Sequence, residues 1–219
     1  MTDDGESYWG GRQASFSSDD QKAWFEAMRE KQWLVPHFPK AYGGGGLSKA
    51  ENKILLSEMK RINARKPLTS FGVSMLGPAL LKFGNEEQKK EHLSKITSGE
   101  IRWCQGYSEP GAGSDLQGVK TTALKDGNHY KINGSKTFIT NGILSDVVIV
   151  YCKTTPGARA KGTSLLVLER GTPGFERGRN LEKIGLHAQD TAELFFEDMR
   201  LPADAVLGRE NQGFIHLID

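Results

Sequence analysis

The sequence contains little cysteine and no long apolar run. Its 219 residues include two cysteines, Cys104 and Cys152, with no CxxC pair, so buried thiols in a reducing compartment are predicted rather than a disulfide framework. No stretch approaches the roughly 18 to 20 apolar residues that a membrane-spanning helix needs. The start at Met1 lacks the basic and apolar regions of a secretory signal. We therefore expect a cytoplasmic protein without a membrane segment, although an organellar protein whose presequence was removed would have the same sequence.

The chain also lacks an excess of charge of either sign. Lys and Arg total 29 and Asp and Glu total 27, a net charge of +2, so charge provides no reason to expect a nucleic-acid partner. Charged residues make up 26% and hydrophobic residues 37%, as in ordinary globular proteins. A chain of this length can form one large domain or two compact ones, so its size permits an enzyme.

Several common motifs are absent too. Residues 111–116 begin like a dinucleotide-binding loop but have a leucine where the third glycine belongs, and residues 157–164 have a threonine in place of the P-loop lysine. Residues 106–110 end in proline where a nucleophile elbow has glycine. The histidines are His37, His92, His129, His187 and His216. They lie singly, without metal-ligand spacing, so no metal site is predicted.

The first hundred residues predict helices. Ser17-Ser18-Asp19 is a typical start for a helix that includes Phe25 and Met28, and Ser48 with Glu51 forms a capping box before a second helix. Two prolines and four glycines in residues 36–46 forbid a regular helix there. Further helices are predicted over 77–83 and from the N-cap Asn85 to the Ser98-Gly99 stop.

After Gly99, β-branched and alternating runs separated by glycine-bearing turns predict strands. Asp126-Gly127 and Asn133-Gly134 stand at hairpin spacing. Short links without helices favour an antiparallel sheet or barrel over a parallel Rossmann sheet. The predicted strands are 101–105, 119–124, 129–132, 136–140, 147–152, 164–168 and 192–196. Residues 214–218 predict the start of another helix.

Two clusters remain as candidate ligand sites. In residues 107–115, small residues allow a ligand to approach the backbone, and N–H groups with the hydroxyls of Ser108 and Ser114 can donate to carbonyl or phosphate oxygens. This pattern fits an anion-binding loop, and it equally fits a polar turn without a ligand. The second cluster, residues 138–142, combines an aromatic, a β-branched residue and a hydroxyl at a strand end, a common arrangement that is weak when taken alone.

Together, about two dozen residues apart, these clusters resemble the paired flavin-binding signatures of the acyl-CoA dehydrogenase family. The resemblance extends over nearly the whole chain, through residues 36–44, 83–89, 130–136, 194–198, 207–208 and 213–214. Residues 115–120 and 185–194 are most similar to long-chain members, whereas 103–108 are more similar to a different bacterial branch. The preferred acyl length and a recombination of two branches are therefore left open.

This resemblance implies an α+β fold, in which an N-terminal all-α helical domain precedes an antiparallel β-barrel-like middle domain. The implied domains are residues 1–100, residues 101–209, and residues 210–219 as the start of a truncated C-terminal helical domain. The family fold places FAD between the middle domain and a C-terminal four-helix bundle. That bundle is expected to be missing from this chain.

Implied cofactor-binding residues follow by matching positions. Residues 105–114 would wrap the flavin and pyrophosphate, with donors near Tyr107 and Ser108 at the pyrimidine end, and Ser114 would contact both FAD and the acyl-CoA substrate. Phe138, where many relatives have tryptophan, would pack along the flavin, and Thr140 would bond near N5. The full implied set is Gln105, Tyr107, Ser108, Gly113, Ser114, Phe138, Ile139 and Thr140.

The implied reaction is α,β-dehydrogenation of a fatty acyl-CoA to the trans-2-enoyl-CoA, in fatty acid β-oxidation: a carboxylate removes the α-proton while the β-hydrogen leaves as hydride to the flavin. In relatives the base is a glutamate of the C-terminal bundle, beyond Asp219. Glu109, beside Pro110, is instead expected to be an architectural acceptor of hydrogen bonds, so no catalytic residue is assigned. Electron-transfer flavoprotein and further copies of the full-length chain, as a dimer or tetramer, are the implied partners.

Two other interpretations stay open. The chain can be a non-catalytic flavin- or acyl-CoA-binding or interaction module on the same scaffold, because the base is absent. An acyl-CoA oxidase is a further alternative, distinguished by rapid reaction of the reduced flavin with oxygen. Yellow colour of the purified protein would separate a flavoprotein from an interaction module.

Overall fold

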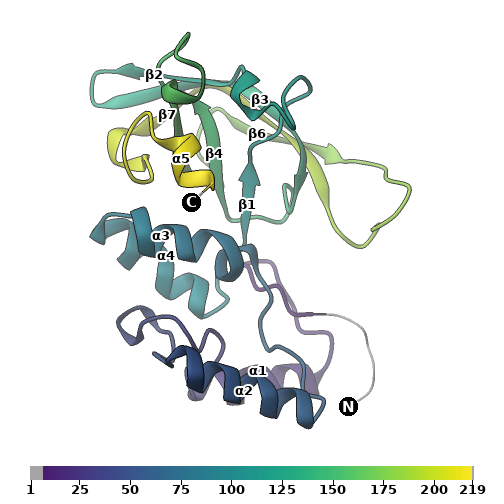
Figure 1. Ribbon diagram of the computed structural model, residues 1–219. Helices are drawn as coiled ribbons and strands as arrows, with labels where there is room; N and C mark the ends of the chain where they lie inside the picture. Colours follow the sequence, from purple (N-terminus) through teal and green to yellow (C-terminus); the bar gives the residue numbers. More distant parts are fainter. Residues whose placement is uncertain (1–6, 219) are drawn as a thin grey trace. The chain divides into compact units, whose positions relative to one another are not determined.

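A computed structural model describes residues 7–218, which form two compact units (Figure 1). The helical unit runs up to Lys82 and includes Glu86–Arg102. The β unit contains Phe83–Asn85 and the chain from Trp103 onward. The predicted boundaries at residues 100 and 209 stay predictions.

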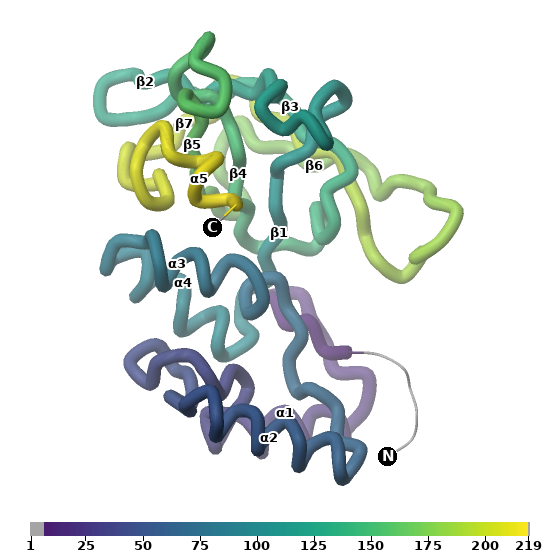
Figure 2. Tube along the Cα trace, viewed as in Figure 1, coloured from purple at the N-terminus to yellow at the C-terminus, as the bar shows by residue number. Residues whose placement is uncertain are grey.

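The helical unit contains four α-helices, which the Cα trace in Figure 2 follows in purple to teal. They are α1 (Asp19–Glu30), α2 (Lys49–Arg61), α3 (Gly77–Phe83) and α4 (Glu86–Thr97). A π-helical turn over Gly72–Leu76 leads directly into α3. No helix within residues 7–218 is both long and apolar enough to cross a bilayer.

Local capping explains where the first two helices begin. The Ser18 hydroxyl accepts a hydrogen bond from the Gln21 N–H at 3.1 Å. At the start of α2, the Ser48 hydroxyl accepts from the Glu51 N–H while the Glu51 carboxylate accepts from the Ser48 N–H at 2.8 Å. Both predicted starts are confirmed, since each side chain satisfies an N–H that the helix leaves unpaired.

The predicted break between α1 and α2 is confirmed. Within residues 36–46 the only helical element is a 3-10 turn at Lys40–Tyr42. A Cβ at Gly44 would lie 2.3 Å from the Phe38 carbonyl oxygen, so this corner requires glycine. Phe38 itself is buried in the core of the helical unit.

The β unit is one curled mixed sheet that forms a half-barrel (Figure 1). Its strand order is β1-β4-β2-β3-β7-β6, and β5 also pairs with β4. The strands are β1 (Trp103–Gly106), β2 (Thr122–Asp126), β3 (His129–Thr140), β4 (Val147–Lys153), β5 (Thr163–Glu169), β6 (Phe175–Asn180) and β7 (Thr191–Pro202). A short helix, α5 (Gly213–Ile218), follows. The predicted α+β fold class, with helices first and a barrel-like sheet second, is confirmed.

Three details of the sheet differ from the sequence prediction. The strand pairings are not all antiparallel, because β1 enters the sheet from the helical unit and pairs with β4 in parallel. Asn133-Gly134 is not a turn: residues 129–140 form the single strand β3, with a register shift at this point against β7. Strand β6 was missed, because its sequence FERGRN has no β-branched residue.

The core of the β unit lies on the inner face of the curled sheet. Alternate residues of β3 and β7 point inward, while β4 and β5 are buried on both faces over most of their length. The core residues with the least exposure include Ala123, Ile132, Val148, Leu166, Leu194 and Met199. This rigid sheet supports the loop that follows β1 and the end of β3.

Candidate functional site

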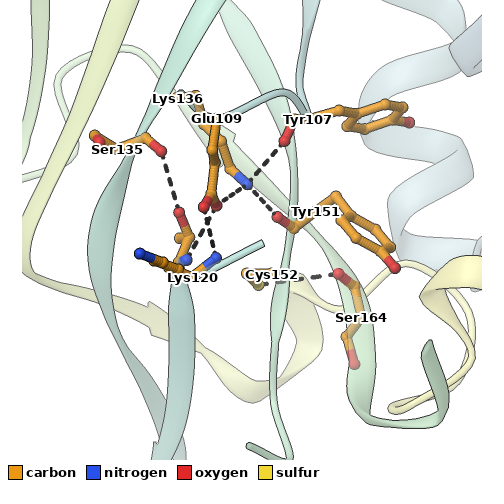
Figure 3. A network of polar contacts seen from close by, with 9 residues as sticks. Tyr107, Glu109, Lys120, Ser135, Lys136, Tyr151, Cys152 and Ser164 are labelled. Atoms are coloured by element: carbon orange, nitrogen blue, oxygen red, sulfur yellow. Dashed lines mark hydrogen bonds and ion pairs between the residues drawn. The ribbon is translucent and has the colours of Figure 1, made fainter. Parts of the chain in front are cut away.

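The structure bonds the first predicted ligand-binding segment to β3, directly before the second. The Thr137 N–H in β3 donates to the Ser108 carbonyl at 2.9 Å, and the Lys136 ammonium donates to the Tyr107 carbonyl at 3.0 Å. The loop after β1 is therefore hydrogen-bonded to the two residues of β3 directly before Phe138, and Figure 3 shows the bond from Lys136 to the Tyr107 carbonyl.

Phe138 occupies an unusual backbone conformation at the end of β3. Its φ is +57°, and it lies where the register of β3 against β7 shifts between Lys136 and Ile139. A non-glycine residue with positive φ is strained, and such strain concentrates at functional sites. The side chain is 71% exposed although it is a large hydrophobic group. The bulge thus presents an aromatic ring to the outside, while the neighbouring Ile139 is buried in the core.

The opposite segment, loop 107–115, has an open side. Gly111, Gly113 and Ser114 are exposed, and a Cβ built at either glycine would meet nothing within 4 Å. Packing within the described chain therefore gives no reason for glycine at these positions. Among residues 7–218 no hydrogen bond of the structure takes the N–H of Gly111, Gly113 or Ser114. Open backbone donors of this kind fit the polar edge of a flavin, and an exposed aromatic side chain such as Phe138 fits its flat ring.

A buried ion pair between Lys136 of β3 and Glu109 of the loop holds loop 107–115 against the sheet (Figure 3). The side chains of Lys136 and Glu109 are 0% and 6% exposed, and their Nζ and Oε1 atoms are 2.8 Å apart. The Lys136 ammonium also donates to the Tyr107 carbonyl at 3.0 Å and to the Tyr151 carbonyl at 2.6 Å. Its three donors are therefore all satisfied, as a buried charge requires.

The Glu109 carboxylate is equally well satisfied. Its Oε2 accepts from the Lys120 N–H at 2.5 Å and its Oε1 accepts from the Thr121 N–H at 3.0 Å. Burial opposes its charge, but the Lys136 ammonium and these donors outweigh burial and hold the pKa of Glu109 below its ordinary value. The expectation that Glu109 is an architectural acceptor is confirmed by these contacts, and a carboxylate so engaged is not available as a base.

The turn after β3 is held from its other side. The Asp190 carboxylate accepts from the N–H groups of Ile143 and Leu144 at 2.8 and 3.2 Å. Arg170 and Arg177 both donate to the Ser145 carbonyl. Burial, with the nearby Arg170, lowers the pKa of Arg177 to about 10, so the Arg177 guanidinium remains charged at neutral pH. These contacts fix the chain immediately after Thr140.

The other predicted site residues lie in or beside this arrangement. Gln105 is in β1, opposite Ile149, and its side chain hydrogen-bonds Tyr107. Burial raises the pKa of the Tyr107 phenol. Thr140 is half-buried and pairs with Thr191 of β7. Their contacts with a cofactor stay predictions.

Sequence reasoning missed Lys136, the residue that connects the two segments. The sequence does contain a signal for it. Lys136 lies an even number of residues from Tyr130 and Ile132, so its side chain is on the same, buried face of β3. A lysine on the buried face of a strand needs an acidic partner. The sequence gives no comparable signal for Asp190, Arg170 and Arg177, because their partners are backbone carbonyls and N–H groups of a turn.

The two cysteines show no sign of reactivity. Both thiols are fully buried, and burial raises the pKa of Cys104 and of Cys152 to about 12. We expect neither to react with Ellman's reagent at pH 8 in the folded chain, and both to react once guanidinium unfolds it. Fast reaction of either thiol without denaturant would contradict their placement in the core.

Comparisons with known proteins show the family to which this chain belongs. The family model "Acyl-CoA dehydrogenase, N-terminal domain" matches residues 7–100, and "Acyl-CoA dehydrogenase, middle domain" matches residues 104–199. The mitochondrial long-chain specific acyl-CoA dehydrogenase of Sus scrofa is 50% identical over 179 residues, 81% of this chain and 42% of the relative. The mitochondrial isovaleryl-CoA dehydrogenase of Pongo abelii is 41% identical over 179 residues, 80% of this chain and 42% of the relative. The chain thus spans less than half the length of these relatives.

A solved structure shows the same fold. The acyl-CoA dehydrogenase of Geobacillus kaustophilus superimposes with a TM-score of 0.75 at 44% identity, over 90% of this chain and 52% of that one. The chain belongs to the acyl-CoA dehydrogenase family, a family of FAD-containing oxidoreductases of fatty-acid metabolism. The resemblance inferred from the sequence is confirmed, including the likeness to long-chain members.

Proposed function

We propose that this chain forms the FAD- and acyl-CoA-binding part of an enzyme that dehydrogenates a fatty acyl-CoA between Cα and Cβ to the trans-2-enoyl-CoA. One observation carries the proposal: loop 107–115, with open N–H donors, is hydrogen-bonded to β3 beside the exposed Phe138. Family membership supports the same assignment. The substrate class and the reaction belong to the proposal.

Each residue of the site has a distinct task in this proposal. FAD, when bound, supplies the hydride acceptor. The N–H groups and hydroxyls of Ser108 and Ser114 donate to oxygen atoms of the cofactor, and Ser114 also contacts the acyl-CoA. Phe138 covers a flat ring, which excludes water from one side. Thr140 donates a hydrogen bond beside the reacting atom and so orients it.

The catalytic base is not assigned within this chain. Glu109, the glutamate of the loop, is committed to Lys136 and two N–H groups. We propose that the base belongs to a segment that corresponds to the part of the longer relatives which this chain does not span. The 219 residues alone would then turn over no acyl-CoA. Electron-transfer flavoprotein and further copies of the full-length chain are proposed partners, and a cytoplasmic location is proposed as well.

The same engagement of Glu109 favours one second candidate, a flavin- or acyl-CoA-binding module without catalysis. The two candidates differ in the activity of a longer protein that also has the part of its relatives which this chain does not span. Reduction of an artificial electron acceptor by that protein with saturated acyl-CoA would support the enzyme, and binding without reduction would support the module. Both candidates predict binding without reduction for the 219 residues alone, so reduction by the purified chain would contradict both.

The cofactor proposal is tested with Phe138→Gly. We expect the purified wild-type chain to bind FAD, seen as visible absorbance and quenching of FAD fluorescence. Without the aromatic ring, FAD should bind roughly 3- to 10-fold more weakly. Glycine accepts the positive φ of this position, so the free energy of unfolding should rise by up to about 1 kcal/mol. Affinity and stability are thus expected to change in opposite directions.

Leu186→Gly is the matched control. Leu186 also has a positive φ, of +52°, and is 81% exposed, but it lies on the arm between β6 and β7. Its replacement should give a similar gain in stability and no change in FAD affinity. A wild-type chain that binds no FAD, or an unchanged affinity in Phe138→Gly, would contradict the proposed site.

A further inference from the structure

We propose that Lys136 and Glu109 are positioning residues: the buried ion pair sets the backbone of loop 107–115 and thereby determines how tightly the loop holds its ligand. The inference rests on the proposed function for the identity of that ligand, FAD. It concerns a pair whose two members face the interior of the β unit and are not placed to touch a bound molecule. Its basis is the set of contacts in Figure 3.

Three consecutive loop residues are each held by another part of the sheet. The Tyr107 carbonyl accepts from Lys136, and the Ser108 carbonyl accepts from the Thr137 N–H. The Glu109 side chain reaches to Lys136 in β3 and to the N–H groups of residues 120 and 121, ahead of β2. Through the ion pair and its hydrogen bonds, the beginning of the loop is therefore joined both to β3 and to residues 120 and 121, which follow the loop.

The bond to the Tyr107 carbonyl also sets the direction of a donor. In a trans peptide, the C=O of one residue and the N–H of the next point to opposite sides. Fixing the Tyr107 carbonyl on Lys136 thus turns the Ser108 N–H away from Lys136. Ser108 is the residue whose donors are proposed to face the cofactor. A rotation of this one peptide plane would remove that donor from its place.

The outer part of the loop has little else to hold it. Glu109 and Ala112 exchange a pair of backbone hydrogen bonds, which closes a turn, while a Cβ at Gly111 or Gly113 would contact nothing. A loop of this kind loses conformational entropy when a ligand orders it. The affinity for the ligand is therefore lower if the loop is not already ordered before binding. Charge-assisted hydrogen bonds between buried groups are strong enough to provide the order in advance.

The hydrogen bond from Lys136 to the Tyr151 carbonyl shows why a neutral side chain at position 136 would not hold the loop. Lys136 binds carbonyls of β4 and of the loop with one ammonium group, at 2.6 and 3.0 Å. Methionine has a similar length but no donor, so it would fill the space and release both carbonyls. Paired with Glu109→Gln, it removes both charges together, which avoids the penalty of a lone buried charge.

The test compares the 219-residue chain with its double variant Lys136→Met/Glu109→Gln. We expect the variant to fold, to bind FAD about tenfold more weakly, equivalent to about 1.4 kcal/mol, and to exchange amide hydrogens faster in residues 107–116. Exchange in β4 and β5 should stay as in the wild type. A pair with a purely structural role would leave the affinity and the exchange of the loop unchanged once the variant is folded.

The matched control is Lys131→Met/Asp198→Asn, which removes an ion pair of 2.9 Å between β3 and the β7 residue Asp198. Those side chains are 43% and 65% exposed, so neither measurement should change. Unchanged loop exchange in the Lys136→Met/Glu109→Gln variant would overturn the positioning role. If the wild-type chain binds no FAD, the proposed function fails, and faster loop exchange would still support the role of the pair in holding the loop.

Discussion

Replacing Lys136 by methionine alone is expected to lower the free energy of unfolding by about 3–5 kcal/mol. The substitution leaves the Glu109 carboxylate buried without its counter-charge and frees the carbonyls of Tyr107 and Tyr151. Desolvation of an unpaired charge is the largest cost, since a side chain that is only 6% exposed is largely removed from water. Denaturant unfolding followed by the fluorescence of the four tryptophans measures the change.

Two variants show whether the lone charge is the cause. Lys136→Met/Glu109→Gln should recover most of the lost stability, because both charges are then absent. Lys131→Met, which breaks an exposed ion pair of the same strand, should change the free energy of unfolding by less than about 1 kcal/mol. If the double variant is as unstable as Lys136→Met, packing around the side chain and not the unpaired carboxylate would explain the loss.

The helical elements could be predicted because their signals are local. Ser18 with Gln21, and Ser48 with Glu51, are three residues apart, and each pair forms within one turn of chain. The proline- and glycine-rich break in residues 36–46 is local as well. Such features follow from the sequence window alone, so their prediction needs no knowledge of the rest of the fold.

The sheet was predicted less completely because its pairings are distant. The prediction of a turn at Asn133-Gly134 was wrong because Asn133 instead bonds Asp198 of β7, 65 residues further on. A two-residue signal for a hairpin was thus overridden by a long-range contact. The Asp126-Gly127 turn, in contrast, joins β2 and β3 as predicted, since its two strands pair with each other.

The candidate site shows the same division. The proximity of loop 107–115 and residues 138–140 was expected from a family resemblance, and the structure bonds the loop to Lys136 and Thr137, the two residues directly before Phe138. The positive φ of Phe138 is not visible in the sequence, because a phenylalanine ordinarily avoids that conformation. The role of Lys136 depends on Glu109, 27 residues earlier, and on the carbonyls of two further elements.

Gly134→Ala is expected to lower the free energy of unfolding by about 2–4 kcal/mol. The φ of Gly134 is +144°, which L-residues rarely adopt, and an added Cβ would lie 2.5 Å from the Thr121 hydroxyl oxygen and 2.7 Å from the Thr121 Cα. The Cα belongs to the backbone, so the clash is not relieved by a change of rotamer. Since the Thr121 N–H binds Glu109 at 3.0 Å, a shift of Thr121 also disturbs the ion pair behind the loop.

Gly127→Ala is the control that separates the effect of the clash with Thr121 from the effect of a positive φ. Gly127 also has a positive φ, of +61°, but a Cβ there meets nothing within 4 Å, so its replacement should cost only about 1 kcal/mol. Unfolding curves of the two variants and the wild type, measured under the same conditions, give the difference. Equal losses would mean that Gly134 is required only for its φ. A larger loss for Gly134→Ala, with faster amide exchange in residues 107–116 for that variant alone, would show that contact between β3 and Thr121 transmits the strain to loop 107–115.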